Sequence, residues 1–132
     1  ALELSVRPGT DDGKREALVE RWYRDQIRAA VPPLLARWQP ILRVDVARFF
    51  VRRMKTMWGS CNHRARTIRF NTELAKKPPE CLEYILVHEM VHLLEPTHNA
   101  RFVALMDRYL PHRELQRVVL NRLPVRQETW TY

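Results

Sequence analysis

The spacing of hydrophobic positions changes several times along the chain, and each change predicts a different kind of element. Apolar and polar residues alternate over residues 2–7, which is typical of a half-buried strand. Over residues 14–38 the apolar positions recur at near-helical spacing. Pro32 and Pro33 lie inside this stretch, and we expect them to divide or kink the helix, because proline removes a backbone donor and clashes with the preceding turn.

The middle of the chain has the pattern of strands. Beyond Pro40, β-branched and aromatic residues over 44–51 predict a strand. Residues 56–61 and 66–71 are two further strand candidates, and the short polar segment between them predicts a hairpin. These three stretches would form a small antiparallel sheet.

The second half of the chain is predicted to be helical. Pro78-Pro79-Glu80 begins a helix that is apolar nearly all round, which is typical of a buried helix, and Glu95-Pro96 ends it. Two more helices are expected at about residues 97–109 and 111–121. We therefore predict an α+β fold in a single domain over residues 1–132, with helices packed on the antiparallel sheet.

Length and composition narrow the class of protein. A chain of 132 residues with 45% hydrophobic and 29% charged residues suits one globular domain. Its apolar runs fall far short of the roughly 20 residues that a membrane span needs, so no membrane association is expected. Cys61 and Cys81 are too few for a disulfide framework, and the start has no signal-peptide pattern. These features favour the cytoplasm.

The charge balance is strongly basic. Lys and Arg number 23 against 15 Asp and Glu, giving a net charge of +8, which favours anionic partners such as nucleic acid or nucleotides. Several cations fall on the predicted sheet and would form a basic stripe; they are Arg52, Arg53, Lys55, Arg64, Arg66 and Arg69. Such a stripe suits a triphosphate or a nucleic acid, but charged strands also block edge-to-edge aggregation.

The buried helix contains the segment His88-Glu89-Met90-Val91-His92, which matches the zincin motif H-E-x-x-H. Histidines four residues apart lie on one helical face, so both imidazoles can bind one cation. Chance produces this motif in a shuffled chain of this composition roughly 0.014 times. A zinc ion would activate a water molecule, and Glu89 would act as the general base.

A third protein ligand would complete a catalytic zinc site. His98 is the natural candidate, because Pro96 ends the helix and lets the chain turn back. The resulting spacing is that of the metzincins, with Glu95 where those enzymes carry glycine. Glu95, Asp107 and Glu114 are rival ligands of suitable chemistry.

The segment Met57-Trp58-Gly59-Ser60-Cys61 supplies candidates for substrate binding. A glycine in a strand indicates a bulge or a close backbone approach, and an exposed strand there can pair with an extended peptide. Alternatively, Trp58 is a core anchor and Gly59 a requirement of the fold. Asn71 would orient a ligand or substrate, or cap the segment that follows it. The candidates for substrate binding are Trp58, Gly59, Ser60, Arg69 and Asn71.

These motifs together resemble the YgjP-like metal-dependent hydrolases, a group similar to the SprT-like and WLM zinc peptidases. The resemblance covers roughly residues 40–112 and rests on Met57 to Cys61, Ile68, Asn71, the H-E-x-x-H motif, His98, Asn99 and Phe102. It implies a minimal zincin with zinc held at His88, His92 and His98. The family usually has a longer β-rich stretch before its helices, to which only residues 2–7 would correspond here.

Three functions follow from these patterns. The leading hypothesis is a zinc-dependent hydrolase of peptidase type that acts on polypeptides. The resemblance also implies a second reading, cleavage of a nucleoside triphosphate such as UTP, because the family is described both as peptidase-like and as a UTP pyrophosphatase. The third reading is a nucleic-acid-binding module with a structural metal. A site of three histidines favours zinc over magnesium, and a closed structural site would leave Glu89 without a role.

Overall fold

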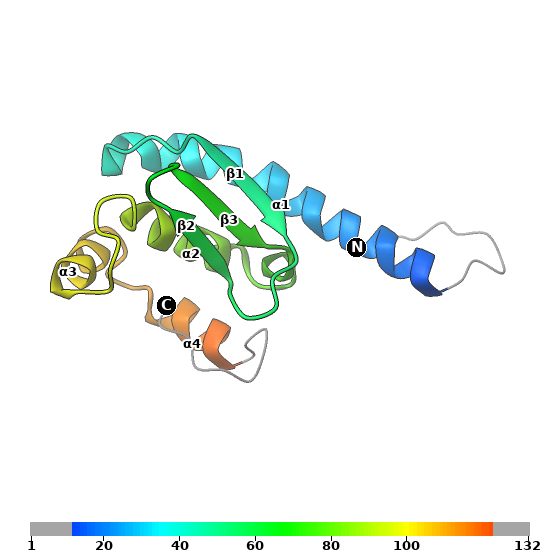
Figure 1. Cartoon of the computed structure of the whole chain (residues 1–132). Helices are drawn as coiled ribbons and strands as arrows, with labels where there is room; N and C mark the ends of the chain where they lie inside the picture. Colours follow the sequence, from blue (N-terminus) through cyan, green and yellow to red (C-terminus); the bar gives the residue numbers. More distant parts are fainter. Residues whose placement is uncertain (1–11, 123–132) are drawn as a thin grey trace.

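A computed structural model describes residues 12–122 of the chain, so the strand predicted at residues 2–7 lies outside the described part. Four α-helices, three strands and one 3-10 helix make up these residues (Figure 1). In chain order they are α1 (Asp12–Leu42), β1 (Arg48–Arg52), β2 (Gly59–Asn62), β3 (Thr67–Asn71), η1 (Thr72–Lys76), α2 (Pro79–Val91), α3 (Ala100–Tyr109) and α4 (Glu114–Arg122). The predicted α+β class is confirmed.

The sheet is mixed, with the strand order β1-β3-β2. β2 and β3 form the predicted antiparallel hairpin, whose turn is held by Asn62 Oδ1, which accepts from the backbone of Arg64 and Ala65. β1 runs parallel to β3, so the prediction of a wholly antiparallel sheet is wrong. The chain crosses from β1 to the far edge of the sheet before the hairpin, and β3 then returns beside β1 in the same direction.

The two faces of the sheet differ because side chains alternate along each strand. Val51, Ile68 and Phe70 are buried on the inner face, which packs against α1 and α2. The opposite face is turned toward the viewer in Figure 1, where no helix of the described residues crosses in front of the strands. This outer face carries exposed polar and charged side chains.

α1 is one helix of 31 residues that continues through Pro32 and Pro33, so these prolines do not divide it. Both prolines lie on the exposed side of the helix, as do Arg28 and Ala29, whose carbonyls lose a helical partner there. Water can therefore satisfy these carbonyls, while the buried side of the helix holds it in place. On that side Trp38 Nε1 donates a 2.9 Å hydrogen bond to Glu83 of α2.

α2 lies at the centre of the molecule and is buried along almost its whole length, as its sequence predicted. It contacts α1, α3, α4 and the inner face of the sheet. Pro79 occupies its first turn, where the missing donor costs little. Within residues 12–122, no helix combines the length and apolar character that crossing a membrane requires.

Candidate metal centre

Three histidine rings converge where α2 ends. His88 belongs to the last turn of α2, His92 is its C-cap residue, and His98 lies in the loop before α3. The Nε2 atom of His98 is 3.0 Å from Nε2 of His92 and 3.3 Å from Nε2 of His88. One ligand atom from each residue lies within 4.8 Å of the others, so the cluster can hold a metal ion.

The loop between α2 and α3 brings His98 back over the end of α2. Asn99 caps α3 by accepting a 3.0 Å hydrogen bond from the backbone of Phe102, and its amide donates a 2.8 Å bond to the carboxylate of Glu95. The amide of Glu95 in turn bonds to the carbonyl of Val91. These local bonds fix the residue before the cap, which is His98.

Phe102 forms one wall of the histidine cluster. Its ring centroid lies 4.9 Å from that of His88, 4.5 Å from that of His92 and 4.9 Å from that of His98. The ring stacks on His92 with an interplanar angle of 26°. Phe102 therefore restricts the rotation of all three imidazoles and keeps water away from one side of the cluster.

The protonation of the histidines suits metal binding. Burial, with a smaller contribution from the neighbouring histidines, lowers the pKa of His88 to about 2. Burial also lowers the pKa of His92, so both rings are neutral at pH 7. Nδ1 of His92 lies 3.1 Å from the carbonyl of Glu95, to which it donates, and this contact directs Nε2 into the cluster. Neutral imidazoles of this kind are the form that binds metal ions.

Glu89 follows His88 in α2 and is only 3% exposed, and burial raises the pKa of its carboxyl group to about 8. Gly59 of β2 packs closely against it. A Cβ atom at this glycine would be 3.3 Å from Glu89 Cγ and 2.7 Å from Ile85 Cγ2. Gly59 thus permits the close approach that the sequence predicted, and it brings the edge of the sheet to the site.

The other predicted substrate-binding residues lie elsewhere in the fold. Trp58 is buried in the core, and Ser60 and Arg69 are paired across β2 and β3 on the outer face. The Asn71 side chain donates to the carbonyls of Met54 and Met57 and accepts from the amides of Met54 and Glu73. This amide therefore caps η1 and holds the loop after β1.

The rival third ligands have different partners. Among the described residues, the metal-binding cluster contains none of them. Glu95 bonds to Asn99, Asp107 pairs with Arg113 at 2.8 Å, and Glu114 lies 3.7 Å from Arg117. The geometry therefore favours His98.

Comparison with known proteins identifies the family of this domain. The model of the family described as YgjP-like, metallopeptidase domain matches residues 1–123. The chain belongs to this family. It is accordingly a metallohydrolase domain of peptidase type, and the family and the histidine cluster together indicate a metal cofactor. No curated protein gave a match.

Two crystal structures are similar to this YgjP-like domain in fold. The metallopeptidase zymogen abylysin of Pyrococcus abyssi is 22% identical and gives a TM-score of 0.62, over 70% of this chain and 94% of that chain. The metallopeptidase zymogen jannalysin of Methanocaldococcus jannaschii is also 22% identical and gives a TM-score of 0.54, over 71% of this chain and 90% of that chain. At this level of identity the similarity concerns the fold.

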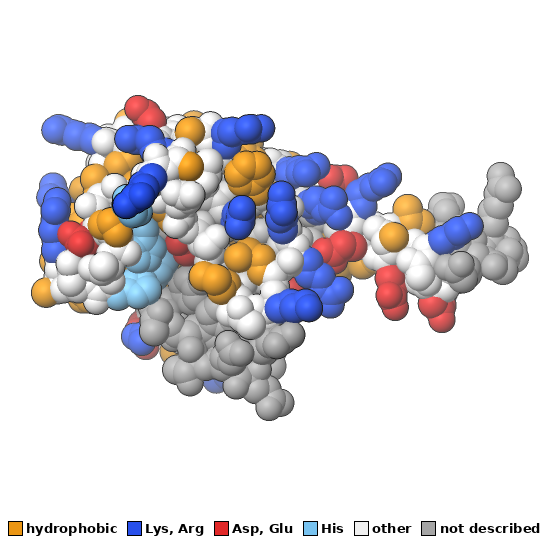
Figure 2. All heavy atoms as spheres, in the orientation of Figure 1, with side chains coloured by type: hydrophobic (Ala, Val, Ile, Leu, Met, Phe, Trp, Pro, Cys, Tyr) orange, Lys and Arg blue, Asp and Glu red, His pale blue; other side chains and the backbone are white. Residues whose placement is uncertain are grey.

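Sequence reasoning missed an open pocket beside the metal site of the YgjP-like domain. It has a volume of about 180 Å³ and adjoins His88 and His98. The sequence signal for its apolar wall was the amphipathic pattern of α3, whose Phe102 and Met106 are buried. The other lining residues are Tyr84, Val103, Arg113 and Arg117. Figure 2 shows histidine side chains at the molecular surface next to the sheet; within the cluster His88 is buried, His92 is half-buried and His98 is exposed.

Proposed function

We propose that this domain is a zinc-dependent peptidase in which His88, His92 and His98 hold the metal and Glu89 is the general base. The convergence of three Nε2 atoms at the end of the helix that also carries the buried Glu89 supports this proposal. Three nitrogen donors suit zinc, whereas magnesium prefers oxygen ligands. Three protein ligands are also the number found in catalytic zinc sites, which keep the fourth position open.

Zinc, when bound, would supply Lewis acidity that lowers the pKa of water and polarises the scissile carbonyl. The protein's own residues would transfer the proton and orient the metal ligands. Glu89 would accept a proton from the attacking water and deliver it to the leaving amine. Its burial supports this role, because a carboxylate that is shielded from water is poorly solvated and accepts a proton more readily. Phe102 and the Glu95 carbonyl would hold the imidazoles in their binding orientation.

The substrate in this proposal is an extended polypeptide. β2 is an edge strand of the described sheet, and its Gly59 lies against Glu89. A peptide that adds to this edge by backbone hydrogen bonds would run past the metal. Gly59 and Ser60 would then contribute through their backbone, while Trp58 and Asn71 serve the fold and Arg69 belongs to the outer face.

We also propose a reducing compartment, the cytoplasm, which is supported by Cys61 and Cys81 being free thiols. A UTP pyrophosphatase and a nucleic-acid-binding module with a structural metal are not favoured. The family is one of metallopeptidases, and a structural zinc site would need a fourth protein ligand.

The test compares the zinc-loaded protein with Glu89→Gln on an unfolded polypeptide and on UTP. We expect the parent to cleave the polypeptide alone, and Glu89→Gln to keep one zinc per chain but lose at least roughly 100-fold in rate. Glu80→Gln, an exposed position in the first turn of the same helix, is the matched control and should keep full activity. Hydrolysis of UTP, or full activity in Glu89→Gln, would refute the proposal.

A further inference from the structure

The positive charge of the chain is concentrated in one segment. Residues 46–72 contain seven of the 23 Lys and Arg residues and none of the 15 Asp and Glu residues. The remainder of the chain holds 16 basic and 15 acidic residues, so it is almost neutral. Nearly all of the net charge of +8 therefore comes from the segment that forms the sheet and its two connections.

The fold turns these cations to the outer face of the sheet and to its two ends. On β1, Arg48, Phe50 and Arg52 alternate with the inward residues, and Phe50 is paired with Arg69 of β3. Arg53 and Lys55 follow β1 at one end, and Arg64 and Arg66 form the turn at the other. We call this set the basic face; it comprises Arg48, Phe50, Arg52, Arg53, Lys55, Arg64, Arg66 and Arg69.

An aromatic ring lies at the centre of the basic face. Phe50 is half-buried, and its ring centroid is 5.6 Å from the guanidinium carbon of Arg48 and 6.0 Å from that of Arg52. The seven cations are exposed, and Figure 2 shows Lys and Arg side chains gathered over the sheet. Within residues 12–122 the ion pairs involve other basic residues, namely Arg37, Lys76, Arg101, Arg113 and Arg117.

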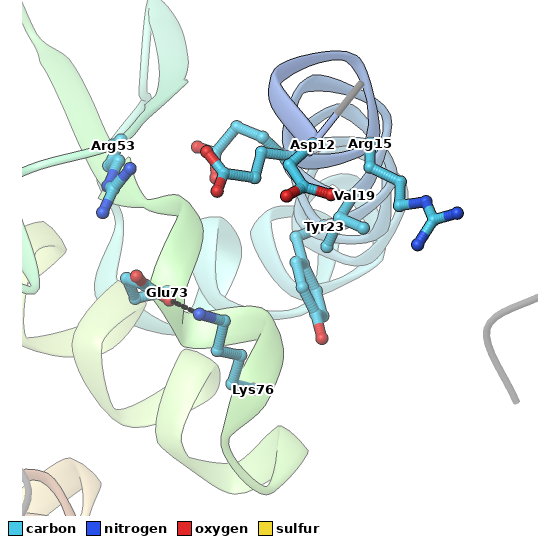
Figure 3. Close-up of a pocket in the computed structure, with 9 residues that line it drawn as sticks. Asp12, Arg15, Val19, Tyr23, Arg53, Glu73 and Lys76 are labelled. Atoms are coloured by element: carbon cyan, nitrogen blue, oxygen red, sulfur yellow. Dashed lines mark ion pairs between the residues drawn. The ribbon is translucent and has the colours of Figure 1, made fainter. Parts of the chain in front are cut away.

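The basic face ends at a pocket of mixed charge. This pocket, of about 540 Å³, lies between α1 and η1, and Arg53 contributes to its wall (Figure 3). Glu73 and Lys76 form an ion pair of 2.6 Å there. On α1 the wall has three carboxylates, Asp12, Glu16 and Glu20, against one cation, Arg15. An anionic ligand would consequently be confined to the sheet.

We propose that the basic face binds single-stranded nucleic acid. Proteins that bind single strands combine a positively charged surface for the phosphates with an aromatic ring on which a base stacks. The basic face offers both, and six of its seven cations are arginines, which bind phosphate in a bidentate manner. A three-stranded face that no helix of residues 12–122 covers suits a splayed strand, whereas a duplex groove is read by an inserted element.

Nucleic-acid binding on this face is independent of the proposed peptidase site. Gly59 and Cys61 point to the inner side of β2, toward Glu89, whereas the basic face is on the opposite side of the sheet. A strand bound there would leave the histidine cluster accessible. A negative result for nucleic-acid binding therefore does not decide whether the domain is a peptidase, and a negative result for peptidase activity does not decide whether the basic face binds nucleic acid.

The test measures fluorescence anisotropy of labelled 12-nucleotide oligo(dT) and oligo(U) with the full zinc-loaded chain over a series of salt concentrations. We expect binding that weakens with salt, with a slope of roughly 0.7 per neutralised phosphate. Arg48→Glu/Arg52→Glu should lose more than about 10-fold in affinity and lower that slope. Comparing the DNA and RNA arms shows which of the two sugars is preferred.

Three further variants make the test specific. Phe50→Ala should weaken binding by about 5-fold or more with an unchanged salt slope, and Phe50→Trp should retain binding, because base stacking is lost only in the first. Arg21→Glu/Arg28→Glu changes the same net charge on exposed positions of α1 and should bind as the parent does. Thermal melting and far-UV circular dichroism verify folding of every variant.

Three outcomes would overturn the proposal. One is an equal loss of affinity in the α1 control, which would indicate net charge alone. Another is unchanged affinity in Phe50→Ala together with equally tight binding of heparin, which would indicate a general polyanion surface. The third is binding to vesicles of phosphatidylserine and phosphatidylcholine without any binding to the oligonucleotides, which would indicate a membrane surface.

Discussion

Gly59 sets the distance between the sheet and the helix that carries the histidines. A methyl group at this position would lie 2.7 Å from Ile85 Cγ2 and 3.2 Å from the carbonyl oxygen of Arg69, with backbone on one side and a buried side chain on the other. Neither neighbour can move without disturbing the sheet or α2. The residue is therefore required by packing, and it lies directly against the proposed general base.

We expect Gly59→Ala to lower the free energy of unfolding by about 1–3 kcal/mol, because overpacking forces the backbone apart. The peptidase activity should fall as well, since β2 would be pushed away from Glu89. Urea denaturation measures the first effect and a peptide-cleavage assay the second. Ser60→Ala, the adjacent residue on the outer side of β2, should change stability by no more than about 0.5 kcal/mol. Equal stability of the two variants would contradict the close packing.

Both thiols are held in the protonated state. Burial, with a smaller contribution from Glu89, raises the pKa of Cys61 to about 12, and burial raises the pKa of Cys81. Because the thiolate is the reactive species, a raised pKa slows reaction with disulfide reagents. At pH 8 we expect both thiols to react with DTNB much more slowly in the native protein than in urea. Reaction of Cys61 at the denatured rate under native conditions would show that β2 is less tightly packed, and the same result for Cys81 would show this for the start of α2.

At the scale of elements, Asn71 joins three parts of the fold. Its side chain caps η1, and it bonds both the amide and the carbonyl of Met54 and the carbonyl of Met57. The loop between β1 and β2 is thus fixed to the end of β3. This loop leads directly into Gly59, so the hydrogen bonds of Asn71 indirectly position β2.

Asn71→Ala should therefore cost about 2–4 kcal/mol of unfolding free energy, because several buried backbone groups lose their partner. Asn62→Ala is the matched control. Asn62 also accepts two backbone hydrogen bonds, but it is exposed and water can replace it, so we expect a loss of at most about 1 kcal/mol. Chemical denaturation compares the two variants. Similar losses of unfolding free energy would indicate that the buried hydrogen bonds of Asn71 do not contribute more to stability than the exposed ones of Asn62.

At the scale of the whole molecule, the features that could be predicted from sequence were local ones. The H-E-x-x-H helix, the hairpin and the turn that returns His98 depend on contacts between residues close in the chain, and the periodicity and Pro96 indicated them. Strand direction at β1 depends on the path of the chain across the sheet, which no local pattern records. The continuity of α1 through Pro32 and Pro33 likewise depends on which side of the helix is buried.

The positions of the side chains around the site were not predicted, although Phe102 is among the residues that carry the family resemblance. Phe102 contacts all three histidine rings only because α3 folds back across the end of α2. Arg69 was predicted both as a substrate-binding residue and as part of the basic stripe, and strand alternation turns it to the outer face. Its place in the fold becomes evident only once the register of β2 and β3 is known.

Metal binding should stabilise the molecule as a whole, because the cluster joins the end of α2 to the loop before α3. A ligand that binds only the folded state at 100 times its dissociation constant adds about 2.7 kcal/mol. We expect treatment with a chelator to lower the Tm by several degrees and added zinc to restore it. His98→Ala should abolish this zinc-dependent shift. An unchanged Tm across all of these conditions would argue against a metal that binds the native cluster.

X-ray absorption spectroscopy of the zinc-loaded protein tests the central claim most directly. We expect one zinc ion per chain, with three imidazole nitrogens at about 2.0–2.1 Å and one further light atom. His98→Ala should reduce the imidazole number to two. A sulfur ligand at about 2.3 Å, which would implicate a cysteine, or a sample that takes up no zinc, would contradict the three-histidine site.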